Sequence, residues 1–187
     1  MSTSVVPPNE RVRSVYRQLS DLLAESDDAF IERGPEALRA ATGDDAFFEN
    51  VETERADGEY TRRLVYREPD GPVVRYMEWP PEYSLMPHEH HGRPCFELLV
   101  DGCLFLADMR AEQVDEGEYA LETVGTNVCE PGDAGVVDPR TGTDIHAVYS
   151  PVRSRSLHVY PDDNHFGIGY VRTGDGDRYA RSRFELD

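Results

Sequence analysis

Three histidines in this chain have the spacing of a metal site built on β-strands. His88 and His90 stand two residues apart, and residues i and i+2 of a strand project from the same face, so both imidazoles could reach one ion. His146 begins another β-rich run and could supply a third ligand. Three neutral imidazoles add no negative charge and leave coordination positions open, which suits Fe(II) that must hold a thiolate, an amine or carboxylate, and O2. Zn(II) held by three histidines remains an alternative on ligand type alone.

The H-x-H pair is only moderately specific by itself. Taken alone, it fits surface or structural histidines about as well as it fits a metal site. His146 follows a segment with Pro and Gly and shifts the balance toward metal binding. His91 would face the opposite side of the strand, so we expect it not to be a ligand.

The composition indicates a globular chain with one main core. There are 187 residues, of which 39% are hydrophobic and 30% charged. No apolar run approaches the roughly 20 residues that span a bilayer, and the N-terminus lacks the features of a signal peptide. The three cysteines, Cys95, Cys103 and Cys129, are too few and too scattered for a disulfide framework, so we expect a cytoplasmic location. Cys103 and Cys129 read as small buried residues.

Acidic residues strongly outnumber basic residues in this chain. Net charge is −18, from 37 acidic and 19 basic residues, and every basic residue is arginine. An acidic chain without lysine predicts a halophilic protein that stays hydrated in molar salt. An ordinary acidic protein encoded by a GC-rich genome is the alternative. We expect neither nucleic acid nor a membrane as a partner, because the sequence contains no basic stripe.

The pattern of elements changes near residue 56. We expect a flexible arm over 1–9, a helical cap over 10–55 and a metal-binding β-barrel over 56–187. The apolar spacing predicts helices at 10–25, at 35–41 with Pro35 in the first turn, and at 44–51. Short apolar runs between turn signals predict an antiparallel sandwich or barrel. The expected strands are 60–67, 73–79, 85–90, 95–100, 103–109, 118–124, 127–130, 134–138, 146–149, 155–160 and 166–172, with a further surface strand and loop in the tail 173–187.

Several segments together resemble a known family. The run His88-x-His90-x4-Cys95, followed by Gly102, resembles the first cupin motif with Cys in place of the usual Glu. Pro139-x2-Gly142-x3-His146 resembles the second. The Cys is similar to that of cysteine dioxygenase, a thiol dioxygenase of the cupin superfamily. The further matches, which extend the similarity over about residues 60–160, are Tyr60-Thr61-Arg62-Arg63-Leu64-Val65, Trp79 and Ser156-Leu157-His158-Val159-Tyr160.

This resemblance implies a fold and a reaction. The fold is an all-β cupin, a double-stranded β-helix (jelly-roll) barrel with a small N-terminal helical cap. The reaction is oxidation of L-cysteine, or of a related small thiol carboxylate such as a 3-mercaptoalkanoate, by O2 to the sulfinate. The cofactor is Fe(II) held by His88, His90 and His146.

The resemblance also implies roles for other residues. Arg62 and Tyr60 would bind the substrate, and Arg62 would hold its carboxylate through a bidentate fork. Ser156, His158 and Tyr160 alternate along a strand and would form a relay of hydroxyl, imidazole and phenol. Cys95 and Tyr160 match a pair that forms a thioether crosslink in some members, and we expect the crosslink here.

Some features depart from the family pattern. Glu97 shares its face with Cys95, at a position where the family usually has no acid. It could pair with a buried arginine, bind the metal, or face outward after a bulge. The region 80–87 and the extra His91 also differ and leave the physiological thiol open. Another metal-dependent cupin enzyme and a non-catalytic ligand-binding cupin stay as alternatives. The sequence does not distinguish a monomer from a homo-oligomer.

Overall fold

The structure, a computed structural model, describes residues 8–49, 51, 59–141, 143–163, 166–174 and 176–185. It begins with the helices α1 (Glu10–Glu25) and α2 (Asp27–Thr42) and the short 3-10 helix η1 (Asp45–Phe47). The strands are β1 (Thr61–Arg67), β2 (Val73–Trp79), β3 (Tyr83–Glu89), β4 (Cys95–Asp101), β5 (Leu104–Asp115), β6 (Glu118–Cys129), β7 (Ala134–Val137), β8 (Ile145–Ser150), β9 (Ser154–Tyr160), β10 (Phe166–Arg172) and β11 (Tyr179–Glu185). A second 3-10 helix, η2 (Pro139–Thr141), precedes β8.

Side-chain caps set the helix boundaries. Asn9 begins α1 by accepting a hydrogen bond from the Val12 N–H at 3.0 Å. Ser26 ends α1 and begins α2, where its hydroxyl oxygen accepts from the Ala29 N–H at 3.0 Å. The first helix coincides with its prediction.

The second helix differs from its prediction. It begins at Asp27, and Pro35 lies inside it rather than in its first turn. The Ser26 cap and the acidic first turn outweigh the cost of an interior proline. The helix predicted at 44–51 is reduced to the three residues of η1.

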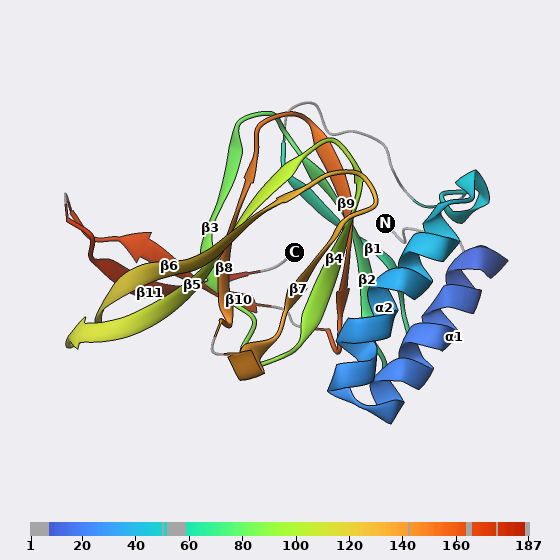
Figure 1. Cartoon of the computed structure of the whole chain (residues 1–187), viewed down its shortest axis with the longest axis horizontal. Helices are drawn as coiled ribbons and strands as arrows, with labels where there is room; N and C mark the ends of the chain where they lie inside the picture. The colour runs from blue at the N-terminus through green and yellow to red at the C-terminus, as the bar shows by residue number, and fades with distance from the viewer. Residues whose placement is uncertain are drawn as a thin grey trace, which may run out of the picture.

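The strands form two antiparallel layers. One is a five-stranded sheet in the order β1-β2-β9-β4-β7, and the other is a closed set in the order β10-β11-β6-β5-β8-β3. The two layers face one another, and both helices lie on the outer side of the five-stranded sheet (Figure 1). The predicted all-β double-stranded β-helix with an N-terminal helical cap is thus confirmed.

Two apolar cores hold these layers. The outer core joins the helices to the sheet; the Phe30 and Phe96 rings, for example, lie 5.2 Å apart. Gly34 permits this approach, since a Cβ there would come within 2.6 Å of the Phe96 ring. The inner core lies between the layers and includes Met77 and Trp79. All seven residues of β2 are buried because this strand is covered on both faces.

The strand predictions are largely confirmed. The observed β2 and β10 coincide with 73–79 and 166–172, and β11 is the strand expected in the tail. The segments predicted at 118–124 and 127–130 are one strand, β6, which pairs with a longer β5. This hairpin projects away from the helices in Figure 1. Gly117, at a φ of 74°, supplies the left-handed turn that closes it.

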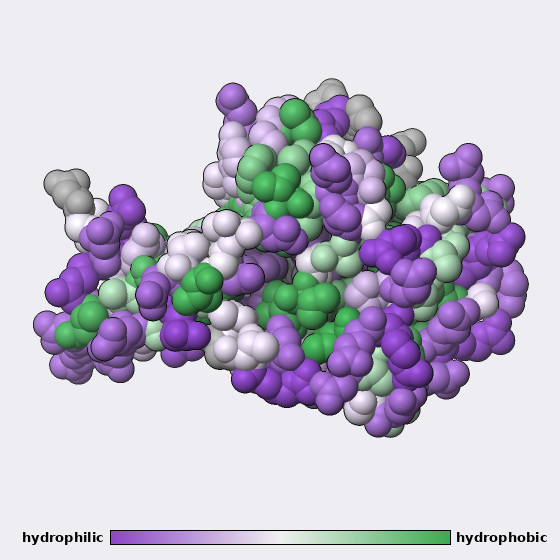
Figure 2. All heavy atoms as spheres, in the orientation of Figure 1, coloured by the Kyte–Doolittle hydropathy of each residue, from purple (hydrophilic) through white to green (hydrophobic). Residues whose placement is uncertain are grey.

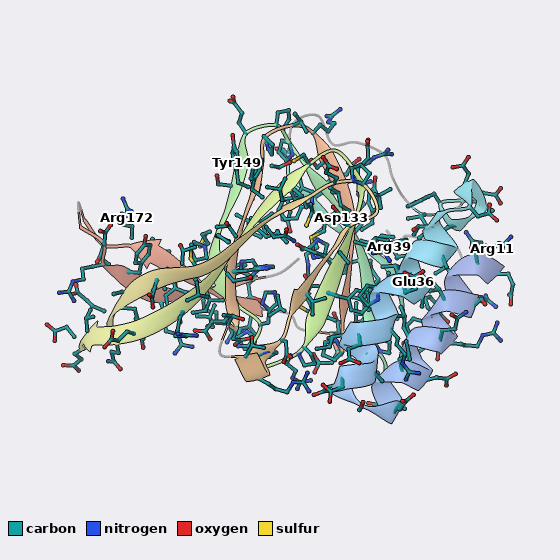
Figure 3. The ribbon with its side chains drawn as sticks, viewed as in Figure 1. Arg11, Glu36, Arg39, Asp133, Tyr149 and Arg172 are labelled. Carbon is teal, nitrogen blue, oxygen red and sulfur yellow. The ribbon has the colours of Figure 1, made fainter. Side chains whose placement is uncertain are left out.

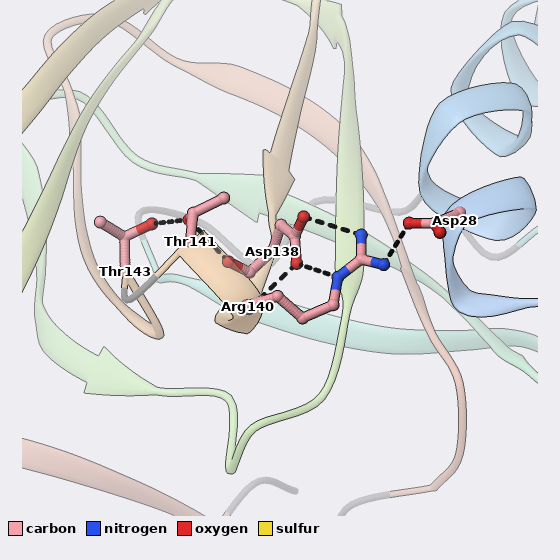
Figure 4. A network of polar contacts seen from close by, with 5 residues as sticks. All are labelled: Asp28, Asp138, Arg140, Thr141 and Thr143. Carbon is pink, nitrogen blue, oxygen red and sulfur yellow. Dashed lines mark hydrogen bonds and ion pairs between the residues drawn. The ribbon is translucent and has the colours of Figure 1, made fainter.

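Two arginines join the helical cap to the barrel. Arg39 of α2 donates from Nε to the Gly132 carbonyl at 2.6 Å, beside Asp133 in the turn before β7 (Figure 3). Arg140 of η2 forms a fork with Asp138, at 2.7 and 2.8 Å, and also contacts Asp28 of α2 (Figure 4). The Arg39 contact therefore ties the turn before β7 to α2, and the Arg140 contacts tie η2, which precedes β8, to the same helix.

The predicted domain limits remain predictions. The arm over 1–9 and the limit between 55 and 56 fall mostly outside the described residues. Among those that are described, no helix is both long and apolar enough to cross a membrane. The face seen in Figure 2 is largely hydrophilic, with an apolar group in the hollow between the two layers.

Candidate metal centre

The three predicted ligands meet on the inner side of the barrel. His88 on β3 and His146 on β8 are register partners, and their ring centroids lie 4.7 Å apart. The His90 centroid lies 5.0 Å from that of His88 and 4.6 Å from that of His146. One nitrogen of each ring lies within 4.8 Å of the others, so the three histidines could hold a single metal ion.

His90 does not reach this position in the way the sequence suggested. The strand β3 ends at Glu89, so His90 lies just beyond it rather than on the strand with His88. The backbone N–H of His90 instead donates to the Asp144 carbonyl at 3.2 Å, which ties this turn to the segment before β8. His91 has a φ of 56°, and its ring lies against Phe166 rather than with the three histidines.

Backbone carbonyls orient two of the imidazoles. The Nδ1 atom of His88 lies 3.0 Å from the Met86 carbonyl oxygen, and that of His90 lies 3.3 Å from the Asp144 carbonyl oxygen. A carbonyl only accepts, so each Nδ1 carries the proton and each Nε2 keeps a free lone pair. A carbonyl acceptor at Nδ1 orients the ring and leaves Nε2 to bind a metal ion.

Burial keeps the three rings neutral. It lowers the pKa of His88 to about 4 and that of His90 to about 3, and it brings the pKa of His146 well below its ordinary value. The repulsion that would arise if neighbouring histidines were protonated together adds to the shift of the pKa at His90 and His146. Three neutral, converging nitrogen donors fit a divalent transition metal.

A cavity of about 370 Å³ opens in front of the histidines. Seven of the predicted site residues line it: Tyr60, Arg62, His88, His90, His146, His158 and Tyr160. The Arg62 guanidinium carbon lies 5.2 Å from the centroid of the Tyr160 ring. Burial raises the pKa of Tyr160 to about 12, although Arg62 acts in the opposite direction through its charge and a hydrogen bond.

Aromatic and apolar side chains form much of the remaining wall. The rings of Tyr60 and Tyr83 stack 5.1 Å apart, and Trp79 lies 4.9 Å from Tyr60. The Tyr60 hydroxyl contacts the Met77 sulfur at 3.2 Å.

The predicted relay is only partly assembled. Ser156 and His158 share the inner face of β9, and Ser156 Oγ lies 2.9 Å from His158 Nε2. The Trp79 indole donates to the same Ser156 oxygen at 2.8 Å. The ring of His158 lies 6.2 Å from that of Tyr160 and almost parallel to it. The Nδ1 atom of His158 faces Glu97 at 3.3 Å, so the described contacts do not continue the relay into the Tyr160 hydroxyl.

Cys95 lies on the neighbouring strand, within reach of Tyr160. The pairing of Phe96 with Val159 across β4 and β9 places Cys95 opposite Tyr160 at the next register position. The thiol is buried and free, and burial raises its pKa well above the ordinary value. Cys95 borders a second cavity rather than the main one.

Glu97 points into the barrel, which resolves one question that the sequence left open. Its side chain is 5% exposed and contacts His158, and it does not belong to the three-histidine group. The buried Arg75 pairs with Asp163 at 2.8 Å rather than with Glu97. Burial, with a smaller contribution from Asp108, raises the pKa of Glu97 to about 7.

The second cavity was not predicted from the sequence. It has a volume of about 160 Å³ and shares His90, His146 and His158 with the main cavity. Asp108 lines it and is the register partner of His146 on the side away from His88. A signal was present, because Asp108 continues the inward alternation of the buried Leu104 and Leu106.

Comparison with known proteins gives structural neighbours only. No protein-family model and no curated protein matches the sequence. A cupin-superfamily protein from Desulfitobacterium hafniense is 14% identical, with a TM-score of 0.44 over 59% of this chain and 84% of that one. A double-stranded β-helix protein from Klebsiella pneumoniae is 14% identical, with a TM-score of 0.45 over 60% and 80%. KdgF from Halomonas sp. is 15% identical, with a TM-score of 0.43 over 60% and 87%.

Proposed function

We propose that this protein is a non-haem Fe(II)-dependent thiol dioxygenase that oxidises L-cysteine, or a related small thiol carboxylate, to the sulfinate. The observation that carries the proposal is that three neutral imidazoles and the Arg62 guanidinium face one cavity. The group of three contains no carboxylate. A site of this kind combines a place for a soft anionic sulfur with a fixed positive charge for a carboxylate.

Arg62 and Tyr160 would bind the carboxylate end of the substrate. A guanidinium matches a carboxylate with two parallel hydrogen bonds. Its position over the Tyr160 ring holds it in a defined orientation. The Tyr160 phenol keeps its proton at neutral pH because its pKa is raised, so it can donate a further hydrogen bond to the substrate.

His88, His90 and His146 would hold the iron. Bound Fe(II) would supply the redox chemistry that adds both oxygen atoms of O2 to the sulfur. The reaction balances without another co-substrate, because a thiol and one O2 together have the composition of the sulfinic acid. The aromatic wall of Tyr60, Trp79 and Tyr83 would exclude water from the reacting groups.

The direct test is O2 consumption by the Fe(II)-loaded protein in high salt. We expect L-cysteine or 3-mercaptopropionate to give one sulfinate per O2 consumed. His91→Asn is a matched control because His91 adjoins the site without joining the three histidines, and Asn tolerates its positive φ. Iron-loaded protein that consumes no O2 with either thiol would contradict the proposal.

One observation favours a second candidate, a metal-dependent cupin enzyme that acts on a larger organic ligand. The cavity of about 370 Å³ falls within the range of pockets that hold drug-sized ligands, and stacked aromatic rings line it. Metal-loaded protein that binds an aromatic carboxylate but does not oxidise thiols would favour this candidate. Purified protein without any metal would instead favour a non-catalytic binding protein.

We also propose a reducing, cytosolic setting for this activity. The three cysteines are free in the structure. The proposed partners are the small thiol and O2, with neither nucleic acid nor a membrane involved.

A further inference from the structure

We propose that Glu97 is a positioning residue that holds His158 in one tautomer and one orientation at the wall of the metal cavity. The inference deepens the proposed function and rests on it for its catalytic consequence. Glu97 and His158 are register partners on the central strands β4 and β9, and both side chains face inward.

The direction of the hydrogen bonds follows from the chemistry of the partners. An indole N–H only donates, so the Ser156 oxygen accepts from Trp79. The Ser156 oxygen lies 2.9 Å from His158 Nε2 and can either donate to it or accept from it, because a hydroxyl has one proton and two lone pairs. A neutral imidazole that accepts at Nε2 carries its proton on Nδ1.

The Glu97 carboxylate on the other side of the ring selects between the two tautomers, because an ionised carboxylate only accepts and so requires the proton on Nδ1. His158 is 6% exposed, and a buried N–H without a partner is costly. The Glu97 Oε2 atom lies 3.3 Å from Nδ1, in close contact but without well-aligned hydrogen-bond geometry, and is the acceptor that we assign to the Nδ1–H. The chain of contacts therefore runs from Trp79 through Ser156 and His158 to Glu97.

The backbone makes room for this acid. Gly135 on β7 is the register partner of Glu97, and a Cβ at Gly135 would come within 2.9 Å of Glu97 Oε1. The carboxylate also borders the second cavity, which has space for water. Neither carboxylate oxygen makes a well-aligned hydrogen bond with any described residue, His158 included, so both oxygens stay available to the Nδ1–H.

The tautomer matters because His158 lines the main cavity together with Tyr160 and the three histidines. With Nδ1–H held by Glu97, the Nε2 edge faces Ser156 and the ring stays almost parallel to Tyr160. With an apolar residue at 97, the imidazole would move its proton to Nε2 and donate to Ser156. The ring would then keep only its contact with Ser156 and lose the contact that fixes its other edge.

Nitrogen NMR of the full chain, labelled with 15N-histidine and loaded with diamagnetic Zn(II), tests this directly. We expect the His158 signals of the Nδ1–H tautomer in the wild type and in Glu97→Gln, whose amide oxygen still accepts. We expect the Nε2–H tautomer in Glu97→Leu. Ser156→Ala should keep Nδ1–H, because Glu97 and not Ser156 holds the proton there. His158→Gln assigns the signals.

Two results would overturn the proposal. One is a wild-type His158 in the Nε2–H form, and the other is an unchanged tautomer in Glu97→Leu. If Glu97→Leu does not fold, loss of Nδ1–H in Ser156→Ala would still refute the role of Glu97.

In the thiol assay, Glu97→Leu should lower kcat on the order of tenfold with little change in KM, and Glu97→Gln should restore most of it. A wild type that oxidises no thiol would remove the proposed function, yet the NMR comparison would still decide the role of Glu97.

Discussion

His88 on β3 lies directly opposite His146 on β8, although the two residues are far apart in the sequence. Both belong to the group of three histidines, so removing either ring leaves only two nitrogen donors for a metal ion. We expect His146→Ala to lower metal affinity by at least tenfold to a hundredfold. Metal content after dialysis, compared with the His91→Asn control, checks this. Equal metal content in both variants would contradict the assignment.

Arg62 provides a second prediction. Loss of its hydrogen bonds to a carboxylate should cost about 2 kcal/mol, or roughly thirtyfold in kcat/KM, for L-cysteine. The effect of Arg62→Ala should fall mainly on KM, because the guanidinium binds a group that does not react. Cysteamine, a thiol without a carboxylate, is the control and should be oxidised similarly by both proteins. An equal loss for the two thiols would argue against carboxylate binding by Arg62.

The position of Cys95 opposite Tyr160 supports a crosslink prediction. Formation of a thioether from the Cys95 sulfur and a Tyr160 ring carbon removes two hydrogen atoms, with O2 as the oxidant. Protein exposed to iron, thiol and O2 should therefore lose the mass of two hydrogens and give one joined peptide. Cys95→Ser should give neither signal. Unmodified peptides from fully active wild-type protein would refute this prediction.

The buried histidines predict an unusual pH dependence of metal binding. Their pKa values, lowered to about 4 for His88 and about 3 for His90, leave both rings neutral at pH 5. Zn(II) affinity, measured by titration calorimetry, should thus change little between about pH 7 and pH 5, whereas ordinary histidines would protonate near pH 6.5. A tenfold loss per pH unit below pH 6.5 would contradict the prediction.

The free energy of unfolding of the metal-free protein should also depend on pH through His88 and His90. Below about pH 6.5 the unfolded chain binds protons that the folded His88 and His90 do not. These two residues should thus make the free energy of unfolding fall as the pH drops from about 6.5 toward 4. Urea unfolding of the wild type and of His88→Gln should show a smaller decrease in the variant. The same decrease in both would show that His88 is not responsible.

The net charge of −18 predicts a salt requirement. Mutual repulsion among exposed acids should destabilise the fold in low salt, and molar salt should relieve it. For a chain of this size, each kcal/mol of relieved repulsion raises Tm by about 2–4 °C. Thermal unfolding in low and in molar KCl measures this effect. Equal Tm values in both would remove the case for halophily.

Local patterns were sufficient for much of the fold. Strand alternation has a period of two residues, so the sequence correctly placed Ser156, His158 and Tyr160 on one face of β9. For the same reason it correctly placed Cys95 and Glu97 on one face of β4. Turn residues and caps act over a few positions, which is why α1, β2 and β10 coincide with their predictions. The predicted start of α2 at residue 35 was wrong. Proline is rare inside helices, so Pro35 indicated a helix start more strongly than the Ser26 cap did.

The sequence by itself determined the ligand types of the candidate metal centre, the strands that carry most of them and the acidic character of the surface. Only the tertiary structure decided that His88 pairs with His146, that the Asp144 carbonyl orients His90 and that His158 turns toward Glu97. The physical reason is that strand register and burial depend on chain segments distant in sequence. No local period specifies which residue of one strand lies beside which residue of another.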